Sequence, residues 1–425
     1  MSINEAFKHP AEIKKIAKSL DTAFYIYHED NVIKNFNNLL SAFKRNWENS
    51  YIAYSYKTNY IPDLVKCMDN LGAFPEVVSD MEHFLAEKQS NRPIFFNGPD
   101  KSISALRNAV VNDSVINLDC FEEIKILKSL LPLSQNKKVK LGIRVNFKDV
   151  GSEFSRFGFS FENGDFQKAI KSIRKDHRFE FFGVHCHVAN RSLATFEKMV
   201  LQIKNLLSKC FSDKELSEIN FISLGGGFYG KMPKLISRQL GLEKTPSFRE
   251  YSSKIKPLTK FLLEKNASSI NLILEPGTAV AADSLSLVCK VISHKKVDTK
   301  DIYSTNGSLF NLFGGVKNKI NLPFYVISNG HKIKLNKTTR TGKTYIAGYT
   351  CIEDDFLTKE SNIKLNIGSL VCYPYAGSYS VVMKPPFIKP DIPIYKFKNG
   401  RFKLIKDAQT NNEVFQNYRL INDSK

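Results

Sequence analysis

A lysine directly follows a stretch that is typical of a β-strand. The segment from Tyr51 to Tyr56 is rich in aromatic and β-branched side chains, and Lys57 stands at its carboxyl end. In a parallel barrel, catalytic side chains gather at that end of the strands. A lysine kept from water there has a lowered pKa and can form a Schiff base with an aldehyde. Because lysines also follow strands as ordinary solvated cations, the significance of Lys57 depends on other stretches.

Two histidines lie two positions apart in the segment from Phe182 to Val188. Side chains of a strand repeat with period two, so His185 and His187 point to the same face. Such a pair can bind a metal ion, pack in the core, or stack on a flat cofactor ring. No acidic residue or cysteine stands at a familiar ligand spacing from the pair, so no metal site is predicted.

Three glycines and a glutamate end two later apolar segments. Without Cβ atoms, Gly225, Gly226 and Gly227 let the backbone approach a phosphate closely, although such a run can also be a simple turn. Glu275 ends the next such segment, just before a proline and Gly277. A carboxylate there would keep a nearby pyridine nitrogen protonated and so make that ring an electron sink. The alternative is an ordinary interior ion-pair partner.

Two stretches closer to the carboxyl terminus carry a thiol and a phenol. Cys351 is followed within four residues by the acids Glu353, Asp354 and Asp355, and Tyr379 comes after a glycine turn. Each stretch is ordinary in itself, because acids crowd surface loops and tyrosines end many strands. They become candidate site residues because they follow the lysine, histidine, glycine and glutamate stretches in that order along the chain.

The elements that must position these side chains alternate between short apolar runs and helical stretches. Eight candidate strands cover about the length of a (β/α)8 barrel. The candidate strands are 51–56, 74–78, 93–97, 114–118, 139–145, 179–188, 220–224 and 270–274. A short strand at 22–27 and an amphipathic helix at 29–43 precede them.

After Gly277 the pattern changes to short strands broken by turn residues, which predicts a second, β-rich domain. The expected fold is α/β: a (β/α)8 TIM-like barrel plus a carboxyl-terminal β-barrel or β-sandwich. We expect an N-terminal segment, 1–28, that packs with the β domain, a barrel at 29–280, and the β domain at 281–425. A length of 425 residues agrees with two domains.

The composition of the chain is that of a globular protein and argues against membrane, disulfide-rich secreted and nucleic-acid-binding classes. Hydrophobic residues make up 42% and charged residues 24%, as in ordinary globular proteins, and no apolar run reaches membrane-spanning length. The seven cysteines show no CxxC spacing, so reduced thiols are expected. The N-terminus lacks a signal-peptide layout, and we expect a cytoplasmic protein. The net charge of +20 is spread along the chain, so nucleic-acid binding is not predicted, whereas anionic groups on a substrate are easy to accommodate.

In their order, these stretches resemble the pyridoxal-phosphate-dependent ornithine, diaminopimelate and arginine decarboxylase family, which has an alanine-racemase-like barrel of fold type III. The resemblance runs from about residue 22 to residue 387. Its motifs are Tyr56-Lys57-Thr58-Asn59, His185-Cys186-His187, Gly225-Gly226-Gly227, Glu275-Pro276-Gly277, Cys351 with Asp355, and Ala376-Gly377-Ser378-Tyr379, with supporting matches at Glu76 and at Ser155-Arg156-Phe157-Gly158.

The resemblance implies a role for each residue. Lys57 would carry pyridoxal 5'-phosphate, His187 would stack on its ring, and Glu275 would pair with its ring nitrogen. Further cofactor contacts would come from Glu76, Asn190, Gly225, Gly226, Gly227, Gly277, Thr278 and Tyr379, and substrate contacts from Glu353, Asp354 and Asp355. Family members are commonly head-to-tail homodimers, so Cys351 would act in the partner's site and protonate the carbanion left by carbon dioxide.

Three departures from the family pattern predict an uncommon substrate. The family usually has arginine where this chain has Thr278, and an acidic residue where it has Ile352. After His187, the usual glycine-serine pair is replaced by alanine and Asn190, so Asn190 or Ser192 would have to do the work of the serine. The chain also lacks the arginine-proline-tyrosine stretch that grips the far carboxylate of diaminopimelate.

We therefore expect a pyridoxal-phosphate-dependent carboxy-lyase, a decarboxylase of a less common or conjugated amino acid, such as an intermediate of siderophore or other secondary metabolism. One alternative is a racemase or eliminase on the same cofactor; racemases of this barrel place an arginine at the ring nitrogen, so Glu275 favours decarboxylation. The other alternative is a catalytically silent regulatory homologue, against which the intact set of Lys57, Glu275 and Cys351 argues.

Overall fold

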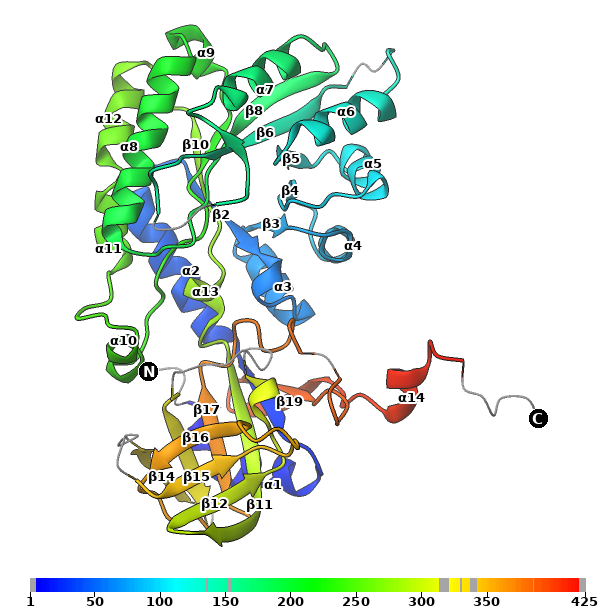
Figure 1. The fold of residues 1–425 in the computed structure, drawn as a ribbon, viewed down its shortest axis with the longest axis vertical. Coiled ribbons are helices and arrows are strands. Elements are labelled where there is room, and N and C mark those ends of the chain that lie inside the picture. Colours follow the sequence, from blue (N-terminus) through cyan, green and yellow to red (C-terminus); the bar gives the residue numbers. More distant parts are fainter. Residues whose placement is uncertain are drawn as a thin grey trace. The chain divides into compact units, whose positions relative to one another are not determined.

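The structure, a computed structural model, describes residues 5–134, 137–151, 155–312, 321–328, 331–336, 342–384 and 386–419. These residues form two compact units (Figure 1). One unit is built from the described residues of 33–231 and 245–280, and the other from those of 1–32, 232–244 and 281–425. Each unit contains a sheet of its own.

The unit built from 33–231 and 245–280 is a closed parallel barrel, which confirms the predicted fold class. In the described part of the chain, parallel strands pair in the order β5-β4-β3-β2-β10-β9-β8-β6, and β6 pairs with β5 to close the ring. These strands are β2 (Ser50–Ser55), β3 (Phe74–Val77), β4 (Phe95–Phe96), β5 (Val115–Leu118), β6 (Val139–Asn146), β8 (Phe179–His185), β9 (Phe221–Ser223) and β10 (Asn271–Leu274). A short strand, β7 (Phe159–Ser160), pairs with the end of β6 and was not predicted.

Helices follow the strands and cover the outside of the barrel (Figure 1). They are α2 (Glu29–Lys44), α3 (Pro62–Asn70), α4 (Asp80–Gln89), α5 (Ile103–Val111), α6 (Phe121–Leu130), α7 (Asp165–Arg174), α8 (Leu193–Cys210), α9 (Asp213–Ser217), α11 (Phe248–Ser253) and α12 (Lys256–Glu264). A short helix, α13 (Thr278–Ala281), follows β10. In α8, Ser192 caps the first turn, and residues 196, 199, 200, 203 and 207 form a buried apolar stripe. The stripe explains why α8 packs along the barrel.

Inside the barrel, five strands show the same two-residue step from an apolar layer to a polar one. The apolar layer is a buried cluster that contains Ala53, Phe95, Val115, Phe221 and Ile273. Side chains on one face of a strand repeat every two residues, so the residue two positions later lies in the next layer toward the carboxyl end. Those residues are Ser55, Asn97, Asn117, Ser223 and Glu275, all polar and all buried. The strands therefore deliver a polar layer at the end of the barrel where active sites lie.

The other unit is built on a β-sheet. Its strands pair in the order β14-β13-β17-β11-β1-β18-β19, and β12, β15 and β16 continue from β11. They are β1 (Phe24–His28), β11 (Leu285–Val297), β12 (Lys300–Thr305), β13 (Phe324–Ser328), β14 (His331–Asn336), β15 (Thr344–Ala347), β16 (Phe356–Ser361), β17 (Leu370–Pro374), β18 (Ile394–Lys398) and β19 (Arg401–Lys406). The helical pieces are η2 (Ala6–Lys8), α1 (Pro10–Lys18), α10 (Lys234–Gln239), η4 (Leu309–Asn311) and α14 (Asn411–Phe415). Side chains from α1, such as Ile13, share one core cluster with side chains of β1, β11 and β17.

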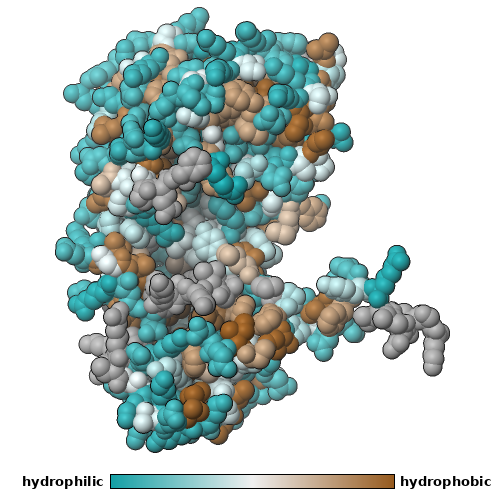
Figure 2. All heavy atoms as spheres, in the orientation of Figure 1, coloured by the Kyte–Doolittle hydropathy of each residue, from teal (hydrophilic) through white to brown (hydrophobic). Residues whose placement is uncertain are grey.

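Hydrophilic residues cover most of the face seen in Figure 2, and hydrophobic residues form small separate groups there. Among the described residues, no helix is long and apolar enough to cross a membrane. The same residues contain no cluster of three or more histidine, cysteine, aspartate or glutamate side chains that could hold a metal ion.

Candidate active site

Lys57 lies in a single 3-10 turn, η3 (Tyr56–Thr58), directly after β2. Its Nζ atom is 2.8 and 2.6 Å from the two carboxylate oxygens of Glu76, which is fully buried at the end of β3. Burial by itself lowers the pKa of Lys57, but the Glu76 carboxylate outweighs that effect and the pKa is raised. The lowered pKa expected from the sequence is therefore wrong, because the ion pair with Glu76 favours the ammonium form.

Glu275 is a buried, ionised carboxylate at the end of β10. Its Oε1 accepts a hydrogen bond from Ser223 Oγ at 2.7 Å, and its Oε2 accepts from Asn97 Nδ2 at 3.2 Å and lies 3.0 Å from His185 Nε2. Burial raises the pKa of Glu275, but His185, the Ser223 hydroxyl and Lys57 together lower it to about 2. A carboxylate that keeps its charge inside a barrel suits a protonated pyridine nitrogen.

His187 presents a neutral imidazole on the loop after β8. The Gly226 N–H donates to His187 Nδ1 at 3.1 Å, so Nδ1 is an acceptor and the ring proton lies on Nε2. Burial, with the nearby charges of Arg144 and Lys57, lowers the pKa of His187 to about 3. An uncharged ring held by its edge leaves a face free to stack on a flat aromatic group. Of the two histidines in the motif, His185 faces Glu275 instead.

The glycines let the ends of neighbouring strands approach one another. A Cβ atom on Gly226 would lie 1.8 Å from the carbonyl oxygen of Glu275, and one on Gly225 would lie 2.5 Å from His187 Nδ1. A Cβ atom on Gly277 would lie 2.1 Å from Thr58 Oγ1. Close packing within the chain thus requires these glycines, apart from any contact with a phosphate. Gly227 has the same property, since its Cβ atom would lie 2.8 Å from a carbonyl oxygen of the loop after β8.

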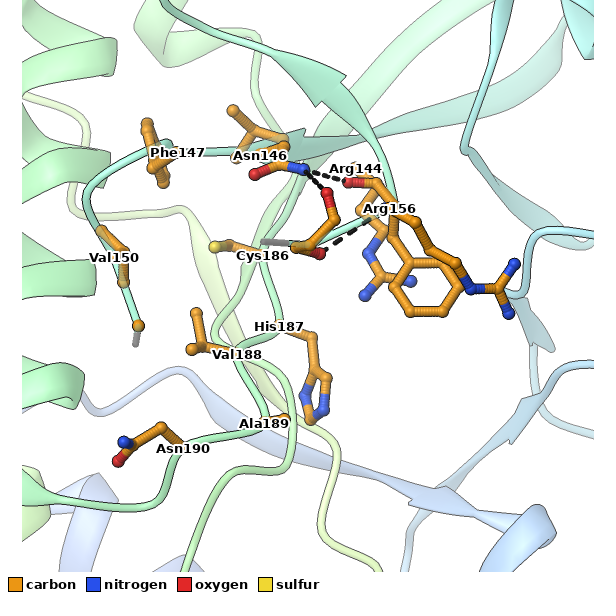
Figure 3. Close-up of a pocket in the computed structure, with 14 residues that line it drawn as sticks. Arg144, Asn146, Phe147, Val150, Arg156, Cys186, His187, Val188, Ala189 and Asn190 are labelled. Carbon is orange, nitrogen blue, oxygen red and sulfur yellow. Dashed lines mark hydrogen bonds between the residues drawn. The ribbon is translucent and has the colours of Figure 1, made fainter. Parts of the chain in front are cut away.

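A cavity of about 550 Å³ opens beside His187 (Figure 3). Its lining combines the end of β6, the following loop, and the loop after β8, and includes Arg144, Asn146, Arg156, His187 and Asn190. The guanidinium groups of Arg144 and Arg156 lie 4.5 and 4.3 Å from the ring centre of Phe157. Two cations at the wall of the cavity suit an anionic group on a ligand. The Asn190 side chain accepts a hydrogen bond from the Ser192 backbone N–H at 2.8 Å and so helps to begin α8.

The acids after Cys351 differ in their surroundings. Cys351, Glu353 and Asp354 are exposed, whereas Asp355 is 4% exposed. The carboxylate of Asp355 accepts hydrogen bonds from the Ser308 hydroxyl and the Leu309 backbone N–H at 3.0 and 2.7 Å, and also from the Thr350 backbone and hydroxyl. Asp355 thus holds this loop together. The substrate contact expected from the sequence is wrong for Asp355, because hydrogen bonds within the loop occupy its carboxylate oxygens.

Two further expected site residues, Thr278 and Tyr379, belong to different units. Tyr379 has a left-handed backbone with φ of 63° in the β-rich unit, and Thr278 is the first residue of α13. Cys351 and Tyr379 belong to the β-rich unit, whereas Lys57 and Glu275 belong to the barrel. The participation of Cys351 and Tyr379 in the barrel site stays a prediction.

Sequence reasoning missed the neutral polar residues of the site, Asn97, Asn117, Ser223 and Ser55, and the cation Arg144. Asn117 Nδ2 donates to Asn97 Oδ1 at 2.6 Å, and Asn97 in turn donates to Glu76 Oε1 at 2.9 Å. A signal for them was present, since each amide stands two residues after an apolar residue of its strand. Arg144 likewise stands near the carboxyl end of a predicted strand.

These residues fit pyridoxal phosphate. The barrel offers an amine, an ionised carboxylate and a neutral imidazole near the ends of three strands, and the buried Thr58 Oγ1 beside Gly277 has no protein partner among the described residues. Among the residues that the structure describes, no cluster of histidine, cysteine, aspartate or glutamate side chains suits a metal ion. Fold and site together therefore define a barrel enzyme that uses pyridoxal phosphate.

Comparison with known proteins identifies the family. Residues 30–282 match the model of the pyridoxal-dependent decarboxylase family, pyridoxal binding domain. The diaminopimelate decarboxylase of Aquifex aeolicus is 25% identical over 95% of this chain and 93% of its own length. An L-glutamyl-[BtrI acyl-carrier protein] decarboxylase of Niallia circulans is also 25% identical, over 95% of each chain. The crystal structure of diaminopimelate decarboxylase from M. jannaschii shares the fold, with a TM-score of 0.80, 20% identity, and coverage of 96% of this chain and 94% of that one.

The chain belongs to the family of pyridoxal-dependent decarboxylases. It is a pyridoxal-phosphate-dependent carboxy-lyase of amino-acid metabolism that acts on an amino acid or an amino-acid conjugate. The racemase, eliminase and silent-homologue alternatives are not favoured.

Proposed function

We propose that this decarboxylase acts at the polar layer of the barrel, with Lys57, His187, Glu275 and Cys351 as its catalytic residues. The observation that carries the proposal is the buried Glu275 carboxylate, which keeps its charge on the same interior surface as the Lys57–Glu76 pair. Glu76, Asn190, Gly225, Gly226, Gly227, Gly277, Thr278 and Tyr379 complete the proposed cofactor site.

When bound, pyridoxal phosphate supplies an electron sink for the pair of electrons left on the α-carbon as carbon dioxide departs. The chain's own residues prepare that step. The Lys57 amine would hold the cofactor, and the ionised Glu275 would hold a proton on the ring nitrogen. The neutral His187 would cover one face of the ring and exclude water from it. Cys351 would donate the proton that replaces the lost carboxylate.

We propose a less common or conjugated amino acid as the substrate. Ile352 and Thr278 stand where the family usually has an acid and an arginine, so a free diamino acid would find a different pocket. Arg144 and Arg156 line the cavity beside His187 and suit an anionic conjugate. The Niallia circulans relative is named for a substrate that is carried on a protein, which supports this class.

The second candidate substrate is diaminopimelate itself, because several similar relatives are named for it. A panel of carboxyl-labelled substrates separates the two candidates: free diaminopimelate, ornithine, lysine, arginine and glutamate against carrier-bound glutamyl and other aminoacyl thioesters. We expect labelled carbon dioxide from a conjugate with a kcat/KM at least about tenfold above that of any free diamino acid. Efficient decarboxylation of free diaminopimelate, ornithine or lysine would contradict the proposed conjugated substrate and show that the enzyme acts on a free diamino acid.

We further propose a head-to-tail homodimer in the cytoplasm. In this arrangement, the domain at 281–425, with the N-terminal segment 1–28 packed on it, would contribute Cys351 and Tyr379 to a site on the partner's barrel, 29–280. Glu353 and Asp354, which are exposed beside Cys351, would then reach the substrate. No nucleic acid or membrane partner is part of the proposal.

A further inference from the structure

One amide side chain joins the two carboxylates of the site. Asn97 follows β4, and its Nδ2 donates hydrogen bonds to Glu76 Oε1 at 2.9 Å and to Glu275 Oε2 at 3.2 Å. All three side chains are buried, with 5%, 0% and 5% of their surface exposed. Two anions that share a buried site repel each other unless donors lie between them. Asn97 supplies both of its N–H groups for that purpose.

A hydrogen bond from Asn117 fixes the orientation of the Asn97 amide. Asn117 Nδ2 donates to Asn97 Oδ1 at 2.6 Å, so the amide oxygen faces a donor and the amide nitrogen faces the carboxylates. The opposite orientation would place an oxygen against two anions. The loop after Asn97 is held as well, since the buried Lys101 ammonium donates to Gly98 O at 2.6 Å and to Glu123 Oε1 at 2.8 Å.

We propose that Asn97 is a positioning residue that holds Glu76 against Lys57 and Glu275 in the place of the ring-nitrogen partner, and so couples the two ends of the cofactor site. The proposal rests on the function proposed above. The Asn97 amide donates to the two carboxylates and accepts from Asn117, so we infer that it acts on the site through the carboxylates.

Other charged and titratable groups also face these carboxylates and set the background of the test. Lys57 stands beside Glu76, and Glu82 of α4 adds a further negative charge near both. His185 of β8 faces Glu275, and His187 lies within the field of Lys57. Glu82, His185 and His187 all remain in a variant of Asn97. A change in the labelling rate of the Lys57 amine therefore reports on the loss of the amide.

The test measures the reactivity of the Lys57 amine in the full-length protein after removal of the cofactor. Each lysine is labelled with a trace of acetic anhydride at pH 8, and the modified peptides are quantified by mass spectrometry. Asn97→Leu keeps the number and branching of the side-chain heavy atoms but removes both donors, which leaves the carboxylates more dependent on the ammonium of Lys57. We expect its labelling rate at Lys57 to fall about threefold, and that of the isosteric Asn97→Asp to fall about tenfold, relative to the other lysines.

The matched control is Asn112→Asp, an exposed asparagine that hydrogen-bonds Glu87 at the end of α5. It should leave the labelling of Lys57 unchanged. Loaded with cofactor, the Asn97 variants should also shift the pH at which the absorbance of the bound cofactor changes, whereas the control should not.

Labelling of Lys57 at the wild-type rate in either folded Asn97 variant would overturn the proposal, and so would a failure of both variants to fold, since that would show a role in folding alone. The labelling needs neither substrate nor turnover. A wild-type protein that releases no carbon dioxide would therefore contradict the proposed function and still leave the role of Asn97 to be decided by the labelling.

Discussion

The chemistry of Lys57 is set by a residue nineteen positions away in the sequence. Glu76 lies on the neighbouring strand, because β2 and β3 pair in parallel with Ser55 opposite Glu76. The pair gives the lysine a raised pKa, although burial acts in the opposite direction. A lysine at a strand end therefore cannot be assigned a pKa until its neighbours across the sheet are known.

Replacement of Glu76 by glutamine should free the Lys57 amine. Loss of the negative charge lowers the pKa of Lys57, so that its labelling by an amine reagent at pH 8 should rise about tenfold. Peptide mapping of the trace-labelled protein measures the rate. Glu122→Gln, at an exposed acid on α6, serves as the control and should change nothing. A Glu76→Gln variant with the wild-type rate would show that Glu76 does not govern the lysine.

A second buried residue makes the fold sensitive to acid. His28 is 3% exposed at the end of β1, its Nε2 lies 2.8 Å from Ser286 Oγ, and burial lowers its pKa from 6.5 to about 4. Because the folded pKa lies below the unfolded value, the stabilisation is complete above pH 6.5 and is lost as the pH falls toward 4.

The free energy of unfolding should therefore fall by on the order of 3 kcal/mol between pH 6.5 and pH 4 through His28. Urea denaturation across this range measures it. His28→Gln removes the titrating group and retains a hydrogen-bonding side chain, so its stability should depend less steeply on pH. An equal slope in the variant would assign the acid sensitivity to other groups.

At the scale of elements, the period of two along the strands explains both what the sequence predicted and what it missed. Apolar runs located the eight barrel strands, because each is short, buried and bounded by helical stretches. Charged and aromatic residues at the strand ends, such as Lys57, His187 and Glu275, attracted attention by their chemistry. Neutral amides at equivalent places, Asn97 and Asn117, did not, since only the closed barrel shows that Asn97 faces two carboxylates and that Asn117 donates to Asn97.

The glycines after β9 determine how closely the ends of two strands approach. A Cβ atom on Gly226 would lie 1.8 Å from the carbonyl oxygen of Glu275, which belongs to rigid backbone. We expect Gly226→Ala to destabilise the protein by about 2 kcal/mol through overpacking and to displace Glu275. Thermal unfolding and cofactor affinity measure the two effects.

The comparison variant is Gly241→Ala, because a Cβ atom there would meet nothing within 4 Å, although its φ of 70° carries a strain of its own. Gly241→Ala should therefore lower stability without loss of cofactor affinity. If Gly226→Ala retained the affinity and stability of the wild type, the close approach of the two strand ends would have no importance for the site.

At the scale of the whole molecule, contacts distant in sequence limited the prediction. The sequence predicted a β-rich domain at 281–425 but not the pairing of its strands, such as that of β18 with β1, where Tyr25 lies opposite Ile394. The acids after Cys351 were grouped by their nearness in sequence, yet only burial distinguishes Asp355, which holds its loop, from exposed Glu353 and Asp354. Which side chains enter a site from a second domain or subunit is likewise beyond a single sequence.

A site shared between subunits makes a specific prediction for mixed dimers. Lys57→Ala and Cys351→Ala should each lose most activity, about a hundredfold or more. When the two are unfolded together and refolded as a mixture, half of the dimers carry one variant of each kind, and each such dimer regains one intact site. Carbon dioxide release should recover to about one quarter of the wild-type value. A mixture no more active than its components would place Cys351 in the site of its own chain or outside it.

The most direct test of the account is the location of the cofactor on the chain. Protein loaded with pyridoxal phosphate is reduced with borohydride and digested, and the modified peptide is identified by mass spectrometry. We expect one covalent adduct, on Lys57, that is absent from Lys57→Ala and present in a Lys125→Ala control, at an exposed lysine of α6. An adduct on another lysine, or none on a protein that has bound the cofactor, would contradict the assignment of this barrel site.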